Sequence, residues 1–259
     1  MACRYPIILV HGIVMKNLKT VKAFGHIEKM LKDAGYDVFV ADTDGIGIIE
    51  TNAEQLKEYI FRVCESRGTD KVNIIAHSKG GLDSKYMITN LGMDDRVASL
   101  TTLCTPHKGS IIASKIWNLP AWIKRFLAFW LNLFYRMLGD KKPDALHACE
   151  QLRWIEEDIQ AHNFSEKVYC QSFSTTMSRG TDSFLMAIPH RIIRRFDNRE
   201  NDGLVCRESS KFGNYRGDCI HNTPVSHAQI IDFFARKDQK AKIYDFYINL
   251  CKELSCMGF

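Results

Sequence analysis

The stretch VNIIAHSKGGLDSKY, residues 72–86, constrains the fold of this chain more than any other. Apolar residues typical of a strand come before Ser78, and a run with helical character follows it. A strand that turns directly into a helix forces the residue at the bend into an unusual backbone conformation, so the residues two positions away must be small. Ala76 and Gly80 occupy those positions. The pattern predicts a tight turn with an exposed Ser78, although an ordinary strand–helix turn with a serine is the alternative.

Segments of strand and helix character alternate along most of the sequence, which predicts an α/β fold. Helices flank a mostly parallel central sheet of about six strands in this interpretation, because parallel strands need helical crossovers between them. The carboxyl ends of such strands meet at one edge of the sheet, where ligands bind. The predicted strands are 5–10, 36–41, 72–76, 97–103 and 168–174, and the predicted helices include 20–34, a helix capped by Thr51 or Asn52 that ends near 65, a helix after His227, and 240–254.

The alternation stops between residues 111 and 165, which we interpret as a helical, apolar cap inserted into a single domain that spans residues 1–259. Its segment WIKRFLAFWLNLFYRML, residues 122–138, is apolar over a far wider face than a surface helix needs. Interrupting charges and a short length argue against a membrane span. The segment is either a helix buried in the cap or a mobile lid that opens at a lipid interface. Its aromatic side chains are candidate substrate contacts, namely Trp122, Phe126, Phe129, Trp130 and Phe134.

Charge and cysteine content exclude several classes of protein. A formal net charge of +5, from 35 basic and 30 acidic residues, is too mild to indicate nucleic-acid binding. The nine cysteines form no CxxC pair, so neither a zinc site nor a thioredoxin-like motif is predicted. Cys206 and Cys219 could pair under oxidising conditions, but free thiols are favoured. The N-terminus lacks the pattern of a signal peptide, which favours the cytoplasm, with signal-less export or a mature secreted form as alternatives.

Ser78 needs a base to take its proton, and the base needs an acid to fix its tautomer. In this type of sheet the chain order is serine, acid, histidine, which Ser78, Asp202 and His227 satisfy. His227 is preferred to His221 because it directly precedes a predicted helix. Asp202 is preferred to Asp197 because Asn201 and Gly203 indicate a tight turn.

The neighbouring polar residues complete this predicted site. The developing oxyanion needs two backbone N–H donors, which we assign to Lys79, directly after the serine, and to Ile13, after the first strand. His77 should point away from the site and serve the structure, and His107 should brace loops. No cofactor is needed by this chemistry.

The stretches YPIILVHG, VNIIAHSKGGLDSKY, VASLTTLCTPHKGS and NDGLV…SH together resemble the bacterial triacylglycerol lipases of the α/β-hydrolase superfamily, in the branch of the Proteus and Pseudomonas-type lipases. The resemblance implies the same nucleophile, acid, base and oxyanion donors as the residue-based analysis. Lipases of this branch also hold a structural calcium, partly through an aspartate two residues after the histidine. Gln229 stands there in this chain, so calcium binding and any other metal site are not expected.

These features predict a serine carboxylic-ester hydrolase that cleaves lipid acyl esters through an acyl-enzyme on Ser78. A short-chain esterase, thioesterase or acyltransferase with the same three residues is the first alternative. A non-catalytic lipid-binding protein with this fold is the second, because fold alone does not establish activity. The expected partners are an acyl ester substrate and a lipid interface contacted through the cap, without nucleic acid or a transmembrane segment.

Overall fold

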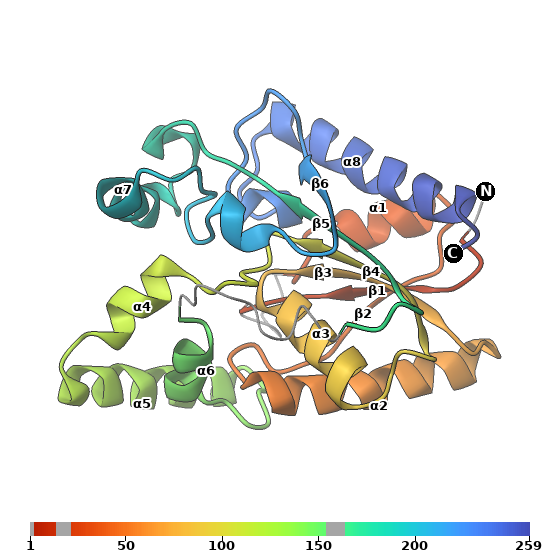
Figure 1. The fold of residues 1–259 in the computed structure, drawn as a ribbon, viewed down its shortest axis with the longest axis horizontal. Helices are drawn as coiled ribbons and strands as arrows, with labels where there is room; N and C mark the ends of the chain where they lie inside the picture. Colours follow the sequence, from red (N-terminus) through yellow and green to blue (C-terminus); the bar gives the residue numbers. More distant parts are fainter. Residues whose placement is uncertain (1–2, 14–21, 154–163) are drawn as a thin grey trace.

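A parallel sheet of six strands forms the centre of the molecule (Figure 1). The computed structural model describes residues 3–13, 22–153 and 164–259. The strand order is β2-β1-β3-β4-β5-β6, and every neighbouring pair is parallel, which confirms the predicted fold class. The strands are β1 (Ile7–Val10), β2 (Val38–Val40), β3 (Val72–His77), β4 (Val97–Leu103), β5 (Tyr169–Ser174) and β6 (Asn214–Asp218).

Helices cover both faces of this sheet. Helices α1 and α8 lie on one face, and α2 and α3 lie on the other (Figure 1). The helices of the described residues are α1 (Ile27–Asp33), α2 (Ile49–Arg67), α3 (Lys79–Asn90), α4 (Ile111–Trp117), α5 (Ala121–Met137), α6 (Ala145–Gln151), α7 (Ala187–Asp197) and α8 (Lys237–Cys256), with short 3-10 turns at Gly180–Asp182, Arg207–Ser210 and Gln229–Ile231.

Strand β1 is apolar at every position because both of its faces are covered. Ile7 and Leu9 pack with α1 and α8, whereas Ile8 and Val10 point to the opposite face and pack with α2 and α3. All four side chains are fully buried. Successive residues of a strand face opposite sides of a sheet, so burial on both sides favours an unbroken apolar run. Strands β3 and β4 also bury polar side chains, which are hydrogen-bonded, as Ser99 is to Asn73.

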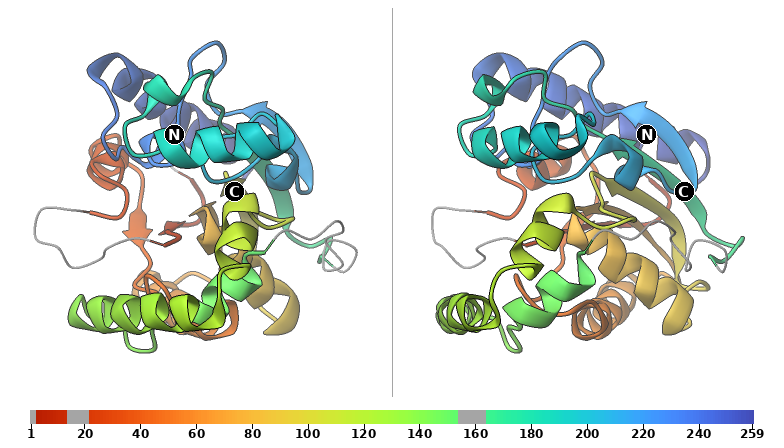
Figure 2. Two further views of the ribbon diagram at one scale, coloured as in Figure 1. Left: turned by 90° about the vertical axis from the view of Figure 1, so that its left-hand side faces the viewer. Right: turned by 60° about the vertical axis from the view of Figure 1, so that its left-hand side comes forward.

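The connection between β4 and β5 carries α4, α5 and α6, which lie with α7 at the carboxyl-terminal end of the strands (Figure 2). This is the segment predicted as a cap; its residues 154–163 lie outside the described part of the chain, and its treatment as a separate unit stays a prediction. No helix among the described residues combines the length and hydrophobicity needed to cross a bilayer.

Three sequence-based predictions of local structure were wrong. Helix α2 begins at Ile49, with Ile48 as its N-cap, rather than after a cap at Thr51 or Asn52. Asn52 lies inside the helix, and its amide nitrogen donates to the Asp44 carbonyl and the Asp83 carboxylate. The helix expected after His227 is only a 3-10 turn, which Asp232 ends with a φ of 64°. Strand β6 is missing from the strands that the sequence predicts. Helix 20–34 is confirmed only in its second half, as α1, and its start at residues 20–21 is not described.

Candidate active site

Ser78 stands at the turn between β3 and α3, with φ 56° and ψ −133°. Non-glycine residues adopt such positive φ values only where the surroundings enforce it. Small neighbours allow the turn: a Cβ on Gly80 would lie 2.5 Å from the His11 carbonyl oxygen, and one on Gly81 would lie 2.1 Å from Thr105 Oγ1. Ser78 is partly exposed while the strand before it is buried. The predicted tight turn is therefore present, and it presents the hydroxyl at the end of the sheet.

The structure brings Ser78, His227 and Asp202 into one hydrogen-bonded line. His227 Nε2 lies 2.8 Å from Ser78 Oγ, and His227 Nδ1 lies 2.7 Å from Asp202 Oδ2. Asp202 Oδ1 accepts from the backbone N–H groups of Leu204 and Val205, at 2.9 and 2.8 Å. The His227 N–H also donates to the Asp202 carbonyl at 2.9 Å. Fixed on both oxygens, the carboxylate can hold the imidazole with Nδ1 protonated and Nε2 facing the hydroxyl as a base.

The other histidines considered in the sequence analysis, His221, His107 and His77, do not take this position. His221 is exposed and lines a separate cavity with Arg216 and Glu253. His107 is buried and stacks on Phe212, with ring centroids 4.5 Å apart. Burial lowers the pKa of both His77 and His107 well below the ordinary value, so both are neutral.

His77 makes a contact that the sequence did not reveal. Its Nε2 donates to the carbonyl oxygen of His227 at 3.0 Å, and the two rings lie 4.5 Å apart. The residue before the serine therefore helps to fix the backbone of the candidate base. A histidine next to the serine was the only sequence signal, and it does not identify the partner.

Gly12 packs closely against the serine turn. A Cβ there would be 2.7 Å from Ser78 Cβ, 2.9 Å from the Lys79 nitrogen and 3.1 Å from Ser78 Oγ. Glycine thus leaves room next to the two groups that a bound carbonyl would contact. Ile13 follows at the last described position before residue 22, and its side chain is 43% exposed. Lys79 opens the 12-residue helix α3, whose N-terminus favours negative charge.

A buried polar network lies behind the Lys79 backbone. Lys79 Nζ and Asp83 Oδ1 form an ion pair at 2.6 Å, and both side chains are almost completely buried. Burial raises the pKa of Asp83 to about 6, against the opposing effect of Lys79. The Asn52 amide donates to Asp83 and to the Asp44 carbonyl. The Asp44 carboxylate in turn accepts from the backbone N–H groups of Lys141 and Lys142, at 2.8 and 2.7 Å. The network thus joins α3 to the chain between α5 and α6.

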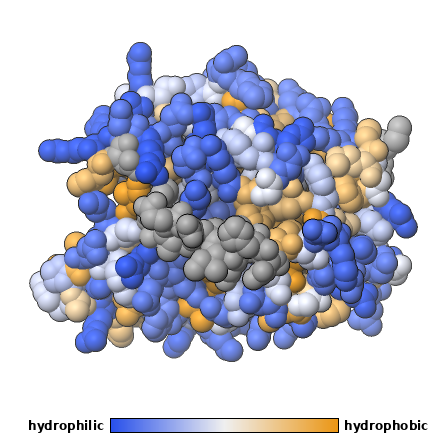
Figure 3. Space-filling view, viewed as in Figure 1, coloured by the Kyte–Doolittle hydropathy of each residue, from blue (hydrophilic) through white to orange (hydrophobic). Residues whose placement is uncertain are grey.

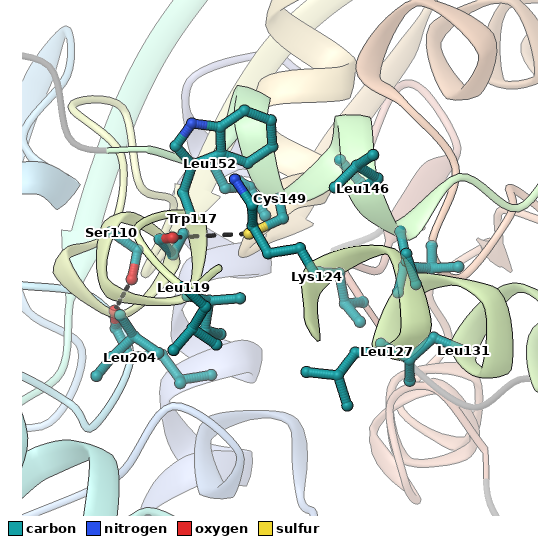
Figure 4. Close-up of a pocket in the computed structure, with 18 of the residues that line it drawn as sticks. Ser110, Trp117, Leu119, Lys124, Leu127, Leu131, Leu146, Cys149, Leu152 and Leu204 are labelled. Atoms are coloured by element: carbon teal, nitrogen blue, oxygen red, sulfur yellow. Dashed lines mark hydrogen bonds between the residues drawn. The ribbon is translucent and has the colours of Figure 1, made fainter. Parts of the chain in front are cut away.

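A cavity of about 420 Å³ lies under the cap (Figure 4). Leu127 and Leu131 of α5, Leu146 of α6 and Trp117 of α4 point into it, and its surface is almost entirely apolar. A second cavity of about 260 Å³ is lined by His77 and His227. Ile13 and Leu204 line both cavities, so the two meet beside the candidate site.

The five aromatic residues proposed as substrate contacts lie elsewhere. Trp122, Phe126, Phe129, Trp130 and Phe134 are exposed by 44–73%, and none lines the apolar cavity in this conformation. The opposite face of α5 does so, through Leu127, Ala128 and Leu131. A buried helix is therefore not what the structure shows, while movement of the cap and substrate contact by these aromatic residues stay predictions. The sequence predicts the helical period of α5 but not which of its faces is covered.

A metal site has little support among the described residues. The one group of metal-ligand side chains there is Cys104, Asp202 and His227, and burial raises the pKa of the Cys104 thiol well above its ordinary value. Gln229, at the position of the calcium ligand in the resembled lipases, uses both ends of its amide. Its Oε1 accepts from the Ser226 N–H at 2.9 Å, and its Nε2 donates to the Asp182 carbonyl at 3.0 Å. A neutral amide with both ends hydrogen-bonded does not fit a calcium site.

The parallel sheet and the serine turn define an α/β-hydrolase. A solved metagenomic carboxyl esterase shares this fold, with a TM-score of 0.76 and 17% identity over 96% of this chain and 76% of that one. Residues 6–183 match the family described as palmitoyl protein thioesterase. This match covers more than half of the sequence, and the chain belongs to that family.

Two curated relatives are named triacylglycerol lipases. The lipase of Pseudarthrobacter phenanthrenivorans is 30% identical over 203 residues, which are 71% of this chain and 63% of that protein. The lipase of Pseudomonas fragi is 26% identical over 291 residues, covering 98% of this chain and 97% of that protein. These similarities confirm the predicted resemblance to bacterial lipases of the α/β-hydrolase superfamily. The chain spans less than two thirds of the length of the first of these relatives.

Proposed function

We propose that the protein is a serine carboxylic-ester hydrolase that cleaves acyl esters of lipids. The observation that carries the proposal is the line of hydrogen bonds from Asp202 through His227 to Ser78, at 2.7 and 2.8 Å. A hydroxyl held in this way loses its proton to the imidazole as it attacks an acyl carbon. The similarity to named triacylglycerol lipases supports a lipid ester as substrate.

The steps follow from the positions of the groups. Ser78 Oγ attacks the ester carbonyl, and His227 Nε2 takes the proton. The backbone N–H groups of Lys79 and Ile13 stabilise the oxyanion in the space beside Gly12. His227 then gives its proton to the departing alcohol, and water releases the acyl group from Ser78 by the same route in reverse.

The two cavities suggest how the substrate lies. The leaving group must reach the proton on His227, which lines the 260 Å³ cavity, so the alcohol part belongs there. The acyl chain then extends into the 420 Å³ cavity, whose apolar surface suits hydrocarbon. In this proposal, the cap encloses the acyl chain and also forms the contact with a lipid interface.

A thioesterase is the second candidate, favoured by the family model that matches residues 6–183. The same three residues can attack either an oxygen ester or a thioester, so the site does not discriminate between them. The esterase and thioesterase candidates would be separated by kcat/KM for two matched substrates. One is the palmitoyl ester of an alcohol, and the other is the palmitoyl thioester of the corresponding thiol. A preference for the thioester beyond its intrinsic reactivity would favour the thioesterase.

A fluorophosphonate probe tests the shared mechanism. The wild-type protein should be labelled on Ser78, while Ser78→Ala should not react, and His227→Ala should hydrolyse esters ~10⁴-fold or more slowly. Thr105→Ser, near the turn but outside the hydrogen-bonded line, is the control and should retain most activity. Absence of labelling in the folded wild-type protein would refute the proposal and favour a binding role.

A further inference from the structure

Tyr135, in the last turn of α5, is a buried tyrosine whose hydroxyl is left without a protein partner. The residue is only 7% exposed. Its hydroxyl forms no hydrogen bond with any residue that the structure describes. Buried tyrosine hydroxyls usually have a hydrogen-bond partner, because enclosing an unpaired polar group costs free energy. An unpaired hydroxyl at this depth therefore indicates a position where a ligand supplies the missing partner.

The Tyr135 hydroxyl is accessible from a cavity. Among the described residues, the Tyr247 hydroxyl is both enclosed and unpaired, whereas the Tyr135 hydroxyl is unpaired but not enclosed. Of the two cavities beside the serine, Tyr135 lines only the smaller one, of about 260 Å³. Its ring belongs to an apolar cluster with Ile46 and Ala128, which line the larger cavity. The ring thus lies between the two cavities, with the hydroxyl accessible from the smaller one.

The smaller cavity is a mostly apolar setting for this hydroxyl. Besides Tyr135, His77 and His227, the only polar side chain that lines it within the described part of the chain is that of Lys22. The outer surface is different, since hydrophilic residues predominate on the face shown in Figure 3. Lys22 is exposed, so its ammonium keeps its hydration, whereas the Tyr135 hydroxyl is largely desolvated. A hydrogen bond formed by this hydroxyl therefore discriminates between ligands with and without an acceptor.

The Tyr135 hydroxyl is a hydrogen-bond donor at neutral pH. Burial, together with the nearby Asp140 carboxylate, raises the pKa of Tyr135 to about 12, so the phenol stays protonated. A phenol O–H donates to hydroxyl, ether or carbonyl oxygens. The proton on His227 goes to the leaving oxygen of the ester itself, so a bond from Tyr135 requires a second oxygen in the leaving group. A simple alkyl alcohol has no second oxygen, whereas a polyol does.

The size of the smaller cavity limits the leaving group. With about 30 Å³ for each non-hydrogen atom, the share of a water molecule in the liquid, 260 Å³ holds about nine such atoms. Glycerol fits, but a glycerol that still carries two long acyl chains does not. We propose that Tyr135 donates a hydrogen bond to a free hydroxyl of the leaving alcohol and so selects monoacyl esters of small polyols such as glycerol. The inference rests on the proposed function, because it assumes that the alcohol occupies this cavity.

Two soluble esters isolate the contribution of the leaving group. Glycerol monobutyrate and propyl butyrate share the acyl chain and a three-carbon alcohol, but only the first has free hydroxyls. Their kcat/KM values are measured in a pH-stat and divided by their rates of alkaline hydrolysis, which removes the difference in intrinsic reactivity. The wild-type protein should prefer glycerol monobutyrate by about tenfold, the factor expected of one hydrogen bond between neutral groups.

The variant Tyr135→Phe removes only the hydroxyl and keeps the ring in its apolar cluster. Its kcat/KM for glycerol monobutyrate should fall about tenfold, whereas the value for propyl butyrate should change much less. The matched control is Tyr59→Phe, which removes a hydroxyl on α2 that lines neither cavity beside the serine. This control should retain the wild-type preference for the glycerol ester.

The failure of this inference is distinguishable from the failure of the proposed function. An equal loss for both esters in Tyr135→Phe would show a purely structural role, and no loss for the glycerol ester would show that the hydroxyl does not meet the leaving group. Either result would overturn the inference, as would a wild-type preference for propyl butyrate, while hydrolysis of both esters would still support the proposed function. A folded wild-type protein that hydrolyses neither ester would overturn the proposed function, and the inference with it.

Discussion

Filling the apolar cavity should change which acyl chains the protein accepts. Ala128 lies on the cavity face of α5 and is 8% exposed. We take the volume of a methylene group as about 30 Å³, that of a water molecule in the liquid. On this basis the 420 Å³ cavity has room for a long acyl chain. The ring added by Ala128→Phe takes the space of about four methylenes, which at ~0.8 kcal/mol each is about 3 kcal/mol of lost burial for the longest substrates.

The assay is a series of p-nitrophenyl esters from butyrate to palmitate. A loss of about 3 kcal/mol corresponds to a roughly 200-fold lower kcat/KM for palmitate, because each 1.36 kcal/mol is a factor of ten. The value for butyrate should change little. Ala121→Phe adds the same ring at an exposed position of α5 and controls for altered helix stability. An unchanged chain-length profile, or an equal loss at every length, would refute the assignment of this cavity to the acyl chain.

Three further predictions concern the surroundings of the serine. Gly12→Ala should lower kcat by about 10²–10³-fold, because its Cβ would crowd the position beside the Lys79 nitrogen where the oxyanion is proposed to bind. Circular dichroism should show an intact fold, and a near-normal kcat would contradict oxyanion binding at this position. Gln229→Ala should reduce the free energy of unfolding by about 2 kcal/mol, since buried partners lose hydrogen bonds. EDTA should leave the urea midpoint of the wild type unchanged, and a midpoint lowered by EDTA would instead support a calcium site. Asp83→Asn should remove a pH-dependent contribution to the free energy of unfolding, because the buried carboxyl group that titrates beside Lys79 is lost. The folded-state pKa of Asp83, about 6, lies above its ordinary 3.8, so this group should make the wild-type free energy of unfolding fall as pH rises between those values; urea titrations that show the same slope in the variant would argue against it.

Much of the central sheet was predictable because buried parallel strands have short runs of mostly apolar and β-branched residues between loop-like or helical segments. β4 was located to the residue, at 97–103. Strand β6, Asn214–Asp218, was not, since its residues are polar and partly exposed and it pairs through its backbone at the sheet edge. The short turn after His227 was read as a helix because its apolar spacing suits one. The buried Asp232 carboxylate, which accepts from His26 and Tyr244, instead fixes a left-handed residue there.

The three candidate catalytic residues could be chosen from the order in which they occur, because this type of sheet brings strand ends to one edge. The other contacts around these residues could not be predicted from the sequence. The bond from His77 to the His227 carbonyl and the space beside Gly12 depend on how distant loops fold against the turn. Which face of α5 lines the cavity depends on how α4 and α6 pack against it. The residue pattern of α5 alone does not contain that information.

The buried network around Asp44 bears on any attempt to re-engineer substrate range. Exchanging the segment between β4 and β5 for that of another hydrolase would be the natural way to graft a new specificity. The Asp44 carboxylate holds the backbone at Lys141 and Lys142, and the same network continues to the serine turn. A chimaera whose junction falls after residue 142 would preserve that anchorage, whereas one that discards it would remove two of the hydrogen bonds to the buried Asp44 carboxylate and leave the one from Gln55.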